Sequence, residues 1–354
     1  MNDSNKPKKI GILTAGGDCP GLNAAIRGVG KTAIVEYGME VIGFNAGYLG
    51  LINGDYNVLK ESQLSGILTV GGTILGTSRE KPYKIAKKNK NENEENKPKK
   101  IKETYKKLGL DCVVCIGGNG TMKTANMLSQ EGLNIIGIPK TIDNDVWGTD
   151  VTFGFDSAVQ IATDAIDRLH TTGNSHQRVM IIELMGHHAG WLSLYSGIAG
   201  GGDIILIPEI PYNIRSVCKK IENRYEEKKA YSIVVVAEGI DHPKGKTAAS
   251  HVADAIQTYT GIETRETVLG YIQRGGSPTP MDRILATRYG AYATQCIAEG
   301  NFGTMVAING NDLTTIPLDD VGGKLRLVDE EHPLISKGRK MGVSFGDEYS
   351  LVSE

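Results

Sequence analysis

Short apolar runs that alternate with amphipathic segments shape this 354-residue chain. The runs Lys9–Thr14, Asn134–Ile138 and Ser232–Ala237 are each bounded by turn residues. Such runs are typical of parallel strands that are buried on both faces. Helix-spaced apolar residues follow them, from Leu22 towards Gly38 and from Phe155 to Leu169. The pattern predicts an α/β, doubly wound, mostly parallel architecture.

Further elements are expected along the rest of the chain. Strands are predicted from Asp111 onward and at Arg178–Leu184, Asp203–Ile207 and Glu266–Ile272. Helices are predicted from near Pro98 to Gly109, up to about Gln130, at Trp191–Ala199, before Ser232 and from about Met281 to Glu299. A chain of this length suits two α/β lobes or one large one.

Charge and hydropathy exclude several function classes. The net charge of −2 gives no general attraction for nucleic acid or anionic membrane. No apolar stretch approaches the roughly 20 residues that a membrane-spanning helix needs. The N-terminus Met1–Lys9 leads directly into a strand and has no signal-peptide core. We expect a soluble, cytoplasmic protein that has no nucleic-acid or membrane partner.

The five cysteines are expected to be reduced thiols. Cys112 and Cys115 have the C-x-x-C spacing of redox and zinc motifs. However, they lie within a predicted strand, where positions three apart point to opposite faces. We interpret both as core residues.

Three glycine-rich turns precede residue 125, at Ala15–Gly21, Val70–Arg79 and Ile116–Met122. A strand, a glycine turn and a helix N-terminus together form a phosphate site from backbone N–H groups. Neither the Rossmann fingerprint nor the Walker lysine is present. The three turns indicate a polyphosphate that lies across several strand ends. The intervening segment Lys87–Lys100, rich in Lys, Asn and Glu, is interpreted as a solvated excursion without chemistry.

The segment Pro139–Asp145 follows the buried run Asn134–Ile138 and supplies Lys140, Thr141, Asp143 and Asp145. Open α/β sheets place their ligands at the carboxyl ends of their strands. A solvated acidic loop is the alternative interpretation of Asp-Asn-Asp, but the neighbouring glycine turns favour a site.

Several ordered motifs span nearly the whole chain. They are Gly-Gly-Asp-Cys-Pro-Gly-Leu-Asn (16–23), Gly-Gly-Asn-Gly-Thr (117–121), Lys-Thr-Ile-Asp-Asn-Asp (140–145), Ser-His-Gln-Arg (175–178), Met-Gly (185–186) and Glu-Thr-Arg-Glu-Thr-Val-Leu-Gly-Tyr-Ile-Gln-Arg-Gly-Gly (263–276). In this order they resemble the phosphofructokinase A family.

The resemblance implies a fold of two similar doubly wound, mostly parallel-sheet lobes with the active site in the cleft between them. A larger donor lobe would comprise 1–153 and roughly 275–320. A smaller sugar-phosphate lobe would comprise 154–274 with the C-terminal segment. The family also implies a homo-oligomer, a dimer or a tetramer, whose active sites are shared across an interface.

The resemblance assigns roles residue by residue. Asp143 resembles the general base that takes the proton from the 1-hydroxyl of fructose 6-phosphate, and Thr141 and Lys140 resemble phosphoryl contacts. The substrate-binding set would be Thr141, Asp143, Asp145, Arg178, Met185, Gly186, His187, Glu238, Arg265, Tyr271 and Arg274. The donor-binding set would be Gly17, Arg79, Gly118, Asn119, Gly120 and Thr121. Arg178 and Arg265 resemble arginines that reach the sugar phosphate from a neighbouring subunit.

Residues 119, 187 and 271 depart from the family pattern. Asn119 replaces the magnesium-associated Asp, so the metal site has one charge fewer. His187 replaces an arginine associated with the transferring phosphoryl group, and Tyr271 replaces a histidine. The family's bacterial effector site is matched only in part, so regulation by ADP or phosphoenolpyruvate is not expected.

The donor signature is mixed. Gly120 has no side chain and leaves room for the α-phosphate and nucleoside of ATP, where pyrophosphate-using relatives carry an Asp. Lys140 resembles the lysine of those pyrophosphate-using relatives. Because an Asp would exclude ATP and a lysine does not, the signature favours ATP with Mg²⁺ and leaves pyrophosphate as the alternative.

Two other function classes stay open from the sequence. Asn119 and His187 are compatible with a catalytically weakened regulatory or binding homologue. The Gly-Gly-x-Gly-Thr turn also occurs in lipid and NAD kinases, although the motifs at 175–178 and 263–276 belong to the sugar-phosphate side.

Overall fold

The computed structural model describes residues 8–84 and 96–347, which form two compact units. The first unit comprises Met1–Thr141, Val146–Gly154 and Arg274–Leu325. The second comprises Ile142–Asp145, Phe155–Gln273 and Arg326–Glu354. Most of the predicted excursion Lys87–Lys100 lies outside the described residues.

The first unit contains a seven-stranded sheet whose centre is parallel. The strand order is β11-β10-β5-β4-β1-β2-β3. The strands are β1 (Lys9–Thr14), β2 (Glu40–Phe44), β3 (Tyr56–Val58), β4 (Cys112–Gly117), β5 (Ile135–Pro139), β10 (Thr304–Asn309) and β11 (Asp312–Pro317). Only the edge strands β3 and β11 pair antiparallel with their neighbours. The register places Thr14 beside Ile116 and Gly117 beside Pro139, so the carboxyl ends of β1, β4 and β5 lie together.

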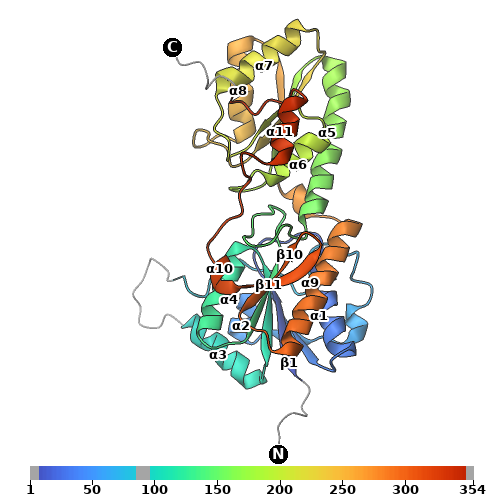
Figure 1. Ribbon diagram of the computed structural model, residues 1–354, viewed down its shortest axis with the longest axis vertical. Coiled ribbons are helices and arrows are strands. Elements are labelled where there is room, and N and C mark those ends of the chain that lie inside the picture. Colours follow the sequence, from blue (N-terminus) through green and yellow to red (C-terminus); the bar gives the residue numbers. More distant parts are fainter. Residues whose placement is uncertain (1–7, 85–95, 348–354) are drawn as a thin grey trace, which may run out of the picture. The chain divides into compact units, whose positions relative to one another are not determined.

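Helices cover both faces of this sheet (Figure 1). They are α1 (Leu22–Val35), α2 (Tyr48–Asn53), η1 (Glu61–Leu64), α3 (Lys97–Leu108), α4 (Asn119–Gln130), α9 (Pro280–Glu299) and α10 (Leu318–Val321). Helices α1 and α9 lie side by side, and their close approach requires glycine. A Cβ at Gly28 would lie 2.8 Å from the Thr287 carbonyl oxygen, and one at Gly290 would lie 2.6 Å from the Ala25 carbonyl oxygen. Both distances are shorter than any real Cβ contact.

The second unit contains a four-stranded, fully parallel sheet in the order β7-β8-β6-β9. Its strands are β6 (Val179–Leu184), β7 (Ile204–Leu206), β8 (Ser232–Ala237) and β9 (Thr264–Val268). Its helices are α5 (Phe155–His176), α6 (Trp191–Ala199), α7 (Ile214–Glu226), α8 (Ala248–Thr260), η2 (Gly270–Arg274) and α11 (Pro333–Lys340). Apolar side chains of α7 and α8 pack on β6 and β8 in one core cluster.

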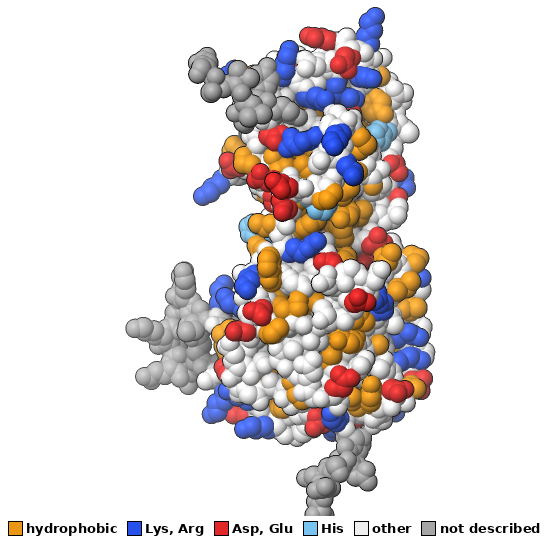
Figure 2. Space-filling view, viewed as in Figure 1, with side chains coloured by type: hydrophobic (Ala, Val, Ile, Leu, Met, Phe, Trp, Pro, Cys, Tyr) orange, Lys and Arg blue, Asp and Glu red, His pale blue; other side chains and the backbone are white. Residues whose placement is uncertain are grey.

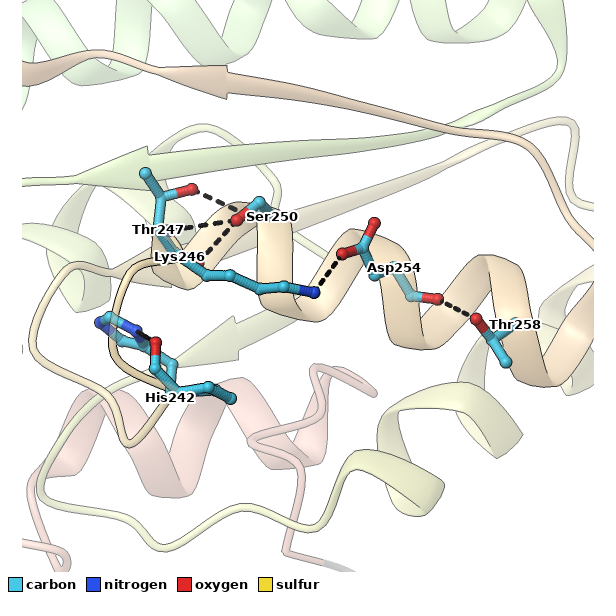
Figure 3. Close-up of polar contacts among 7 residues, drawn as sticks. His242, Lys246, Thr247, Ser250, Asp254 and Thr258 are labelled. Atoms are coloured by element: carbon cyan, nitrogen blue, oxygen red, sulfur yellow. Dashed lines mark hydrogen bonds and ion pairs between the residues drawn. The ribbon is translucent and has the colours of Figure 1, made fainter.

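Helix α8 begins at a reciprocal capping box (Figure 3). The Thr247 hydroxyl accepts from the Ser250 N–H at 3.0 Å, and the Ser250 hydroxyl accepts from the Thr247 N–H at 3.1 Å. The pair satisfies two backbone donors that a helix N-terminus leaves without intrahelical partners. An ion pair between Lys246 and Asp254 at 2.6 Å spans the same first turns. This cap fixes where the chain turns into α8 after the end of β8.

The doubly wound, mostly parallel α/β prediction is confirmed, with two local corrections. The strand predicted at Glu266–Ile272 is β9, Thr264–Val268, followed by the turn of η2. Gly270 adopts φ +54°, which ends the extended conformation. The predicted pattern also omitted the strands β2, β3, β10 and β11 and the helices α2, η1, α8, α10 and α11.

The interpretation of the cysteines as core residues is confirmed for the described chain, in which all five are free and buried. Burial raises the pKa of the Cys115 thiol to about 12 and that of Cys112 well above its ordinary value. A thiol that stays protonated and inaccessible is a poor nucleophile and metal ligand. The C-x-x-C spacing therefore reflects strand packing.

Charges of both signs are interspersed over the surface of each unit on the face shown in Figure 2. Among the described residues, no helix is both long and apolar enough to cross a membrane.

Candidate active site

The first and third glycine turns meet at the carboxyl edge of the first sheet. The Ala15 N–H donates to the Ile116 carbonyl at 3.0 Å, and the Thr121 hydroxyl donates to the Ala15 carbonyl at 3.4 Å. The Lys140 N–H donates to the Gly117 carbonyl at 3.0 Å, which joins the end of β5 to the same edge. The segments that follow three adjacent strands, β1, β4 and β5, therefore meet at one edge of the sheet.

The second glycine turn docks against the first. The Gly16 N–H donates to the Ser78 carbonyl at 2.9 Å, and the Thr77 hydroxyl donates to the Gly16 carbonyl at 2.7 Å. The Thr14 hydroxyl donates to the Gly76 carbonyl at 2.7 Å. Arg79 is the last residue of this turn and is exposed.

The N-terminus of α4 supplies the amide groups that an anion needs. Its N-cap is Gly118, and its first residues are Asn119, Gly120 and Thr121. The amides of a first helical turn lack intrahelical partners and carry the positive end of the helix dipole. Apart from its two chain neighbours and the nearby backbone of α4, no heavy atom of the described residues lies within 4 Å of the position that a Cβ of Gly120 would take. The space beside Gly120 is therefore open to a ligand.

Lys140 brings a buried cation to the meeting point of the turns. Its side chain is only 3% exposed, and its ammonium donates to the Gly17 carbonyl. The adjacent Thr141 is also buried, and its carbonyl accepts from the Thr152 hydroxyl at 2.8 Å. A charge buried this deeply is retained only where polar groups satisfy it, which these turns do.

Arg274 belongs to the first unit, although the resemblance assigns it to the sugar. Its guanidinium donates to the Asp18 carbonyl at 3.3 Å. A Cβ at Gly17 would overlap that guanidinium, so glycine is required for Arg274 to reach the first turn.

The Asp143–Asp145 segment packs with the second unit. Its middle residue, Asn144, is buried and adopts φ +53°, a left-handed conformation that Asn tolerates better than most residues. The N–H of Arg326 donates to the Asp145 carbonyl at 2.9 Å. The predicted base Asp143 thus lies in a turn that tertiary contacts hold in place.

Glu238 organises the turn after β6. Its carboxylate accepts from the His187 N–H at 2.9 Å and from the Gly186 N–H at 3.3 Å. The Met185 N–H donates to the Gln273 side-chain oxygen at 2.9 Å. Four predicted substrate residues, Met185, Gly186, His187 and Glu238, are therefore joined at the carboxyl ends of β6 and β8. Gln273 lies in a quoted motif, yet its supporting contact was not foreseen.

Arg178 and Arg265 converge on one carboxylate. Arg178 Nε donates to Glu263 Oε2 at 2.7 Å, and Arg265 donates to the other Glu263 oxygen. The hydrogen bond from Arg178 is the main cause that holds the pKa of the Glu263 carboxyl below its ordinary value. Two guanidinium groups held together in this way form a surface suited to a phosphate dianion.

Tyr271 lies in η2 and is 72% exposed. The second unit also contains a cavity of about 680 Å³ that begins just beyond the ends of β7 and β8. Its lining includes Tyr212, Asp241, His242 and His251, and none of the predicted site residues.

The described part of the chain contains no cluster of three or more His, Cys, Asp or Glu side chains that could hold a metal ion by themselves. Mg²⁺, however, is commonly bound through one or two protein groups together with substrate phosphates and water. The predicted metal residue Asn119 lies at the N-terminus of α4, where a polyphosphate would supply the other oxygens. The residues present therefore fit a Mg²⁺ ion that arrives with its phosphate substrate.

The glycine turns and buried Lys140 lie at the carboxyl ends of strands of the first sheet, and the paired Arg178 and Arg265 lie at the amino ends of β6 and β9. These features are typical of phosphate-binding α/β proteins. The model of the family described as Phosphofructokinase matches residues 9–297. The chain belongs to the phosphofructokinase family.

Relatives that are 45% to 61% identical carry the name ATP-dependent 6-phosphofructokinase. One, from Bacteroides thetaiotaomicron, is 61% identical over 96% of this chain and 100% of its own length. Another relative, from Amycolatopsis methanolica, is named pyrophosphate–fructose 6-phosphate 1-phosphotransferase. It is 45% identical over 91% of this chain and 97% of its own length.

The solved structure of Pichia pastoris phosphofructokinase in the T-state is similar, with a TM-score of 0.81 and 33% identity. The match covers 91% of this chain and 36% of the Pichia chain.

Proposed function

We propose that this protein is an ATP-dependent 6-phosphofructokinase, which transfers the γ-phosphoryl group of ATP to the 1-hydroxyl of fructose 6-phosphate. The single observation that carries the proposal is the convergence of glycine turns and buried Lys140 at one sheet edge, in a member of the phosphofructokinase family. The names of the relatives at 45% to 61% identity support ATP as the donor.

In this proposal, the first unit holds the donor. The amides of Gly118, Asn119 and Gly120 cradle the phosphates at the N-terminus of α4, and Arg79 neutralises their charge. Lys140, where the turns meet, binds the phosphoryl oxygens. Thr141 contacts the phosphoryl group that is transferred. The backbone of Gly17 contacts the donor beside these residues. The Thr121 hydroxyl joins the third turn to the first by its hydrogen bond to the Ala15 carbonyl.

The second unit holds the sugar phosphate. Met185, Gly186 and His187 contact the sugar from a turn that Glu238 keeps in shape, and Glu238 itself accepts from a sugar hydroxyl. The family resemblance assigns Tyr271 and Arg274 as further substrate contacts. Asp145 lies beside the base, in the same turn.

Asp143 is the general base of the proposed reaction. Its carboxylate takes the proton of the 1-hydroxyl as the sugar oxygen forms a bond to the γ-phosphorus and the bond to the β–γ bridging oxygen breaks. ADP leaves with the electron pair of that bond. When bound with ATP, Mg²⁺ would neutralise phosphate charge near Asn119. Positioning and charge neutralisation supply most of the catalysis in such transfers.

One assay tests the function. Fructose 1,6-bisphosphate formation is measured with a coupled enzyme system, with ATP or pyrophosphate as donor and fructose 6-phosphate as acceptor. We expect a kcat/KM with ATP that exceeds the value with pyrophosphate. No product with either donor would contradict the proposal and would favour a regulatory or binding homologue.

Pyrophosphate is the second candidate donor. Lys140 resembles the lysine of pyrophosphate-using relatives, and the Amycolatopsis methanolica relative carries such a name. A higher kcat/KM with pyrophosphate in the same assay would establish this alternative.

We also infer a homo-oligomer, a dimer or a tetramer, located in the cytosol, where free thiols stay reduced. Arg178 and Arg265 of one subunit would bind the sugar phosphate of a neighbour. Co-expression of Asp143→Ser and Arg265→Ala subunits, each inactive alone, should then yield activity that neither variant has. Activity of a protein that is monomeric by sedimentation at the assay concentration would contradict shared sites.

A further inference from the structure

The catalytic segment Ile142–Asp145 is fastened to the second unit by a residue with no motif around it, Arg326. The Arg326 N–H donates to the Asp145 carbonyl at 2.9 Å, and its Nη1 donates to the Asn144 carbonyl at 3.2 Å. One residue therefore binds both carbonyls that follow Asp143. It is the first residue of the C-terminal segment of this unit.

Trp191, at the start of α6, fixes Arg326 in turn. The guanidinium carbon lies 4.0 Å from the centre of the Trp191 ring, within the range of a cation–π interaction. The Trp191 Nε1–H donates to the Arg326 carbonyl at 2.9 Å. Trp191 is only 3% exposed, so the ring that packs against Arg326 is part of the core.

The carboxylate of Glu209 stabilises the chain segments that carry Trp191 and Arg326. Glu209 accepts from the Gly190 N–H at 2.9 Å, immediately before Trp191, and from the Val328 N–H at 2.9 Å, two residues after Arg326. Glu209, in the turn that follows β7, thereby joins the two chain segments. Trp191 and Arg326 are held by more than their contact with each other.

The turn that Arg326 contacts contains a residue whose backbone conformation requires support from its surroundings. Asn144 adopts φ +53°, and a non-glycine residue in this region persists where surrounding contacts over-determine it. Asp143 directly precedes it, so a relaxation of Asn144 would move the carboxylate of Asp143. A displacement of about 1 Å in a reacting group can cost roughly 100-fold in rate.

We propose that Arg326, held by Trp191, is a positioning residue whose guanidinium keeps the Asp143 carboxylate in its catalytic orientation through the carbonyl of Asn144. This inference rests on the proposed function, because Asp143 is the base of that reaction. Arg326 acts through the turn, and its effect should appear in kcat rather than in substrate affinity.

The test compares Arg326→Leu with Arg339→Leu. Arg339 is a matched control because it also lies over an aromatic ring, that of Phe345 at 5.1 Å, in the same unit, and none of its described contacts involves residues 142–145. We expect Arg326→Leu to lower kcat roughly 10- to 100-fold, with KM for fructose 6-phosphate within about twofold of the parent. Arg339→Leu should retain the parent kcat. Arg326→Lys keeps the charge but not the planar group that stacks on Trp191, so its kcat should lie between those of Arg326→Leu and Arg339→Leu.

Two further readouts separate positioning from general stability. In an Asp143→Ser background, Arg326→Leu should cause no further loss of kcat, because the carboxylate that it positions is absent. Amide hydrogen exchange of peptides that cover residues 142–146 should be roughly 10-fold faster in Arg326→Leu and unchanged in Arg339→Leu. If Arg326→Leu fails to fold, Arg326→Lys carries both measurements.

An unchanged kcat in a folded Arg326 variant, or equal losses with and without Asp143, would overturn the inference. If the parent itself forms no product with either donor, the proposed function fails instead. The exchange measurement then still decides whether Arg326 holds the turn, since it requires no substrate.

Discussion

Replacing Asp143 by Ser is expected to lower kcat by about 10²- to 10⁴-fold, the usual contribution of a positioned general base. Ser leaves the turn at Asn144 intact but offers no carboxylate to take the proton of the sugar hydroxyl. Because the base acts only as the proton moves, KM for fructose 6-phosphate should stay close to the parent value.

The same substitution at an exposed aspartate of the same unit tests whether the loss of any carboxylate lowers kcat. Asp164 is exposed on α5, in the same unit, and its side chain accepts from Gln160 at 2.7 Å. Asp164→Ser should therefore retain the parent kcat. Steady-state kinetics of the two variants, with matching thermal unfolding, make the comparison. An Asp143→Ser enzyme that turns over at a near-normal rate would remove Asp143 from its role.

The centre of each sheet could be predicted from the sequence because its strands are buried on both faces. The runs of β1, β4, β5, β6 and β8 consist mainly of apolar residues, and their burial in the structure is nearly complete. The two antiparallel edge strands of the first sheet, β3 and β11, lack this signal. β3 is exposed at all three positions, and β11 is exposed at Asp312, Thr314 and Pro317, so neither produces an apolar run.

The parts of the candidate site that could be predicted are those where a short motif directly follows a buried strand, because the end of that strand fixes the place of the motif. Glycine turns after buried strands indicated the edge at which β1, β4 and β5 end, and the structure brings those turns together. The supporting contacts were not predictable, because they join segments far apart in the chain. Arg326 reaches Asn144 across 182 positions, and no local pattern distinguishes it from other arginines.

Replacing Gly120 by Asp is expected to change the donor that the enzyme can use. The Asp carboxylate would enter the open space beside the N-terminus of α4, where the α-phosphate and nucleoside of ATP are proposed to lie. Like charges that meet in a binding site cost several kcal/mol, and each 1.4 kcal/mol is a factor of ten. We expect kcat/KM with ATP to fall by about 100-fold or more, while use of pyrophosphate is retained or improved.

The substitution should leave the fold intact, which makes the result interpretable. Apart from its chain neighbours and the nearby backbone of α4, no described heavy atom lies within 4 Å of the added Cβ. A carboxylate in the first turn of a helix also interacts favourably with the helix dipole. The unfolding temperature of the Asp variant should therefore equal or exceed that of the parent. Gly120→Asn is the matched control, because it has the size of Asp without its charge. A loss of ATP use in the Asp variant alone indicates charge repulsion, whereas an equal loss in both indicates that the side chain fills the nucleoside space. An Asp variant that uses ATP as well as the parent would show that Gly120 does not select the donor.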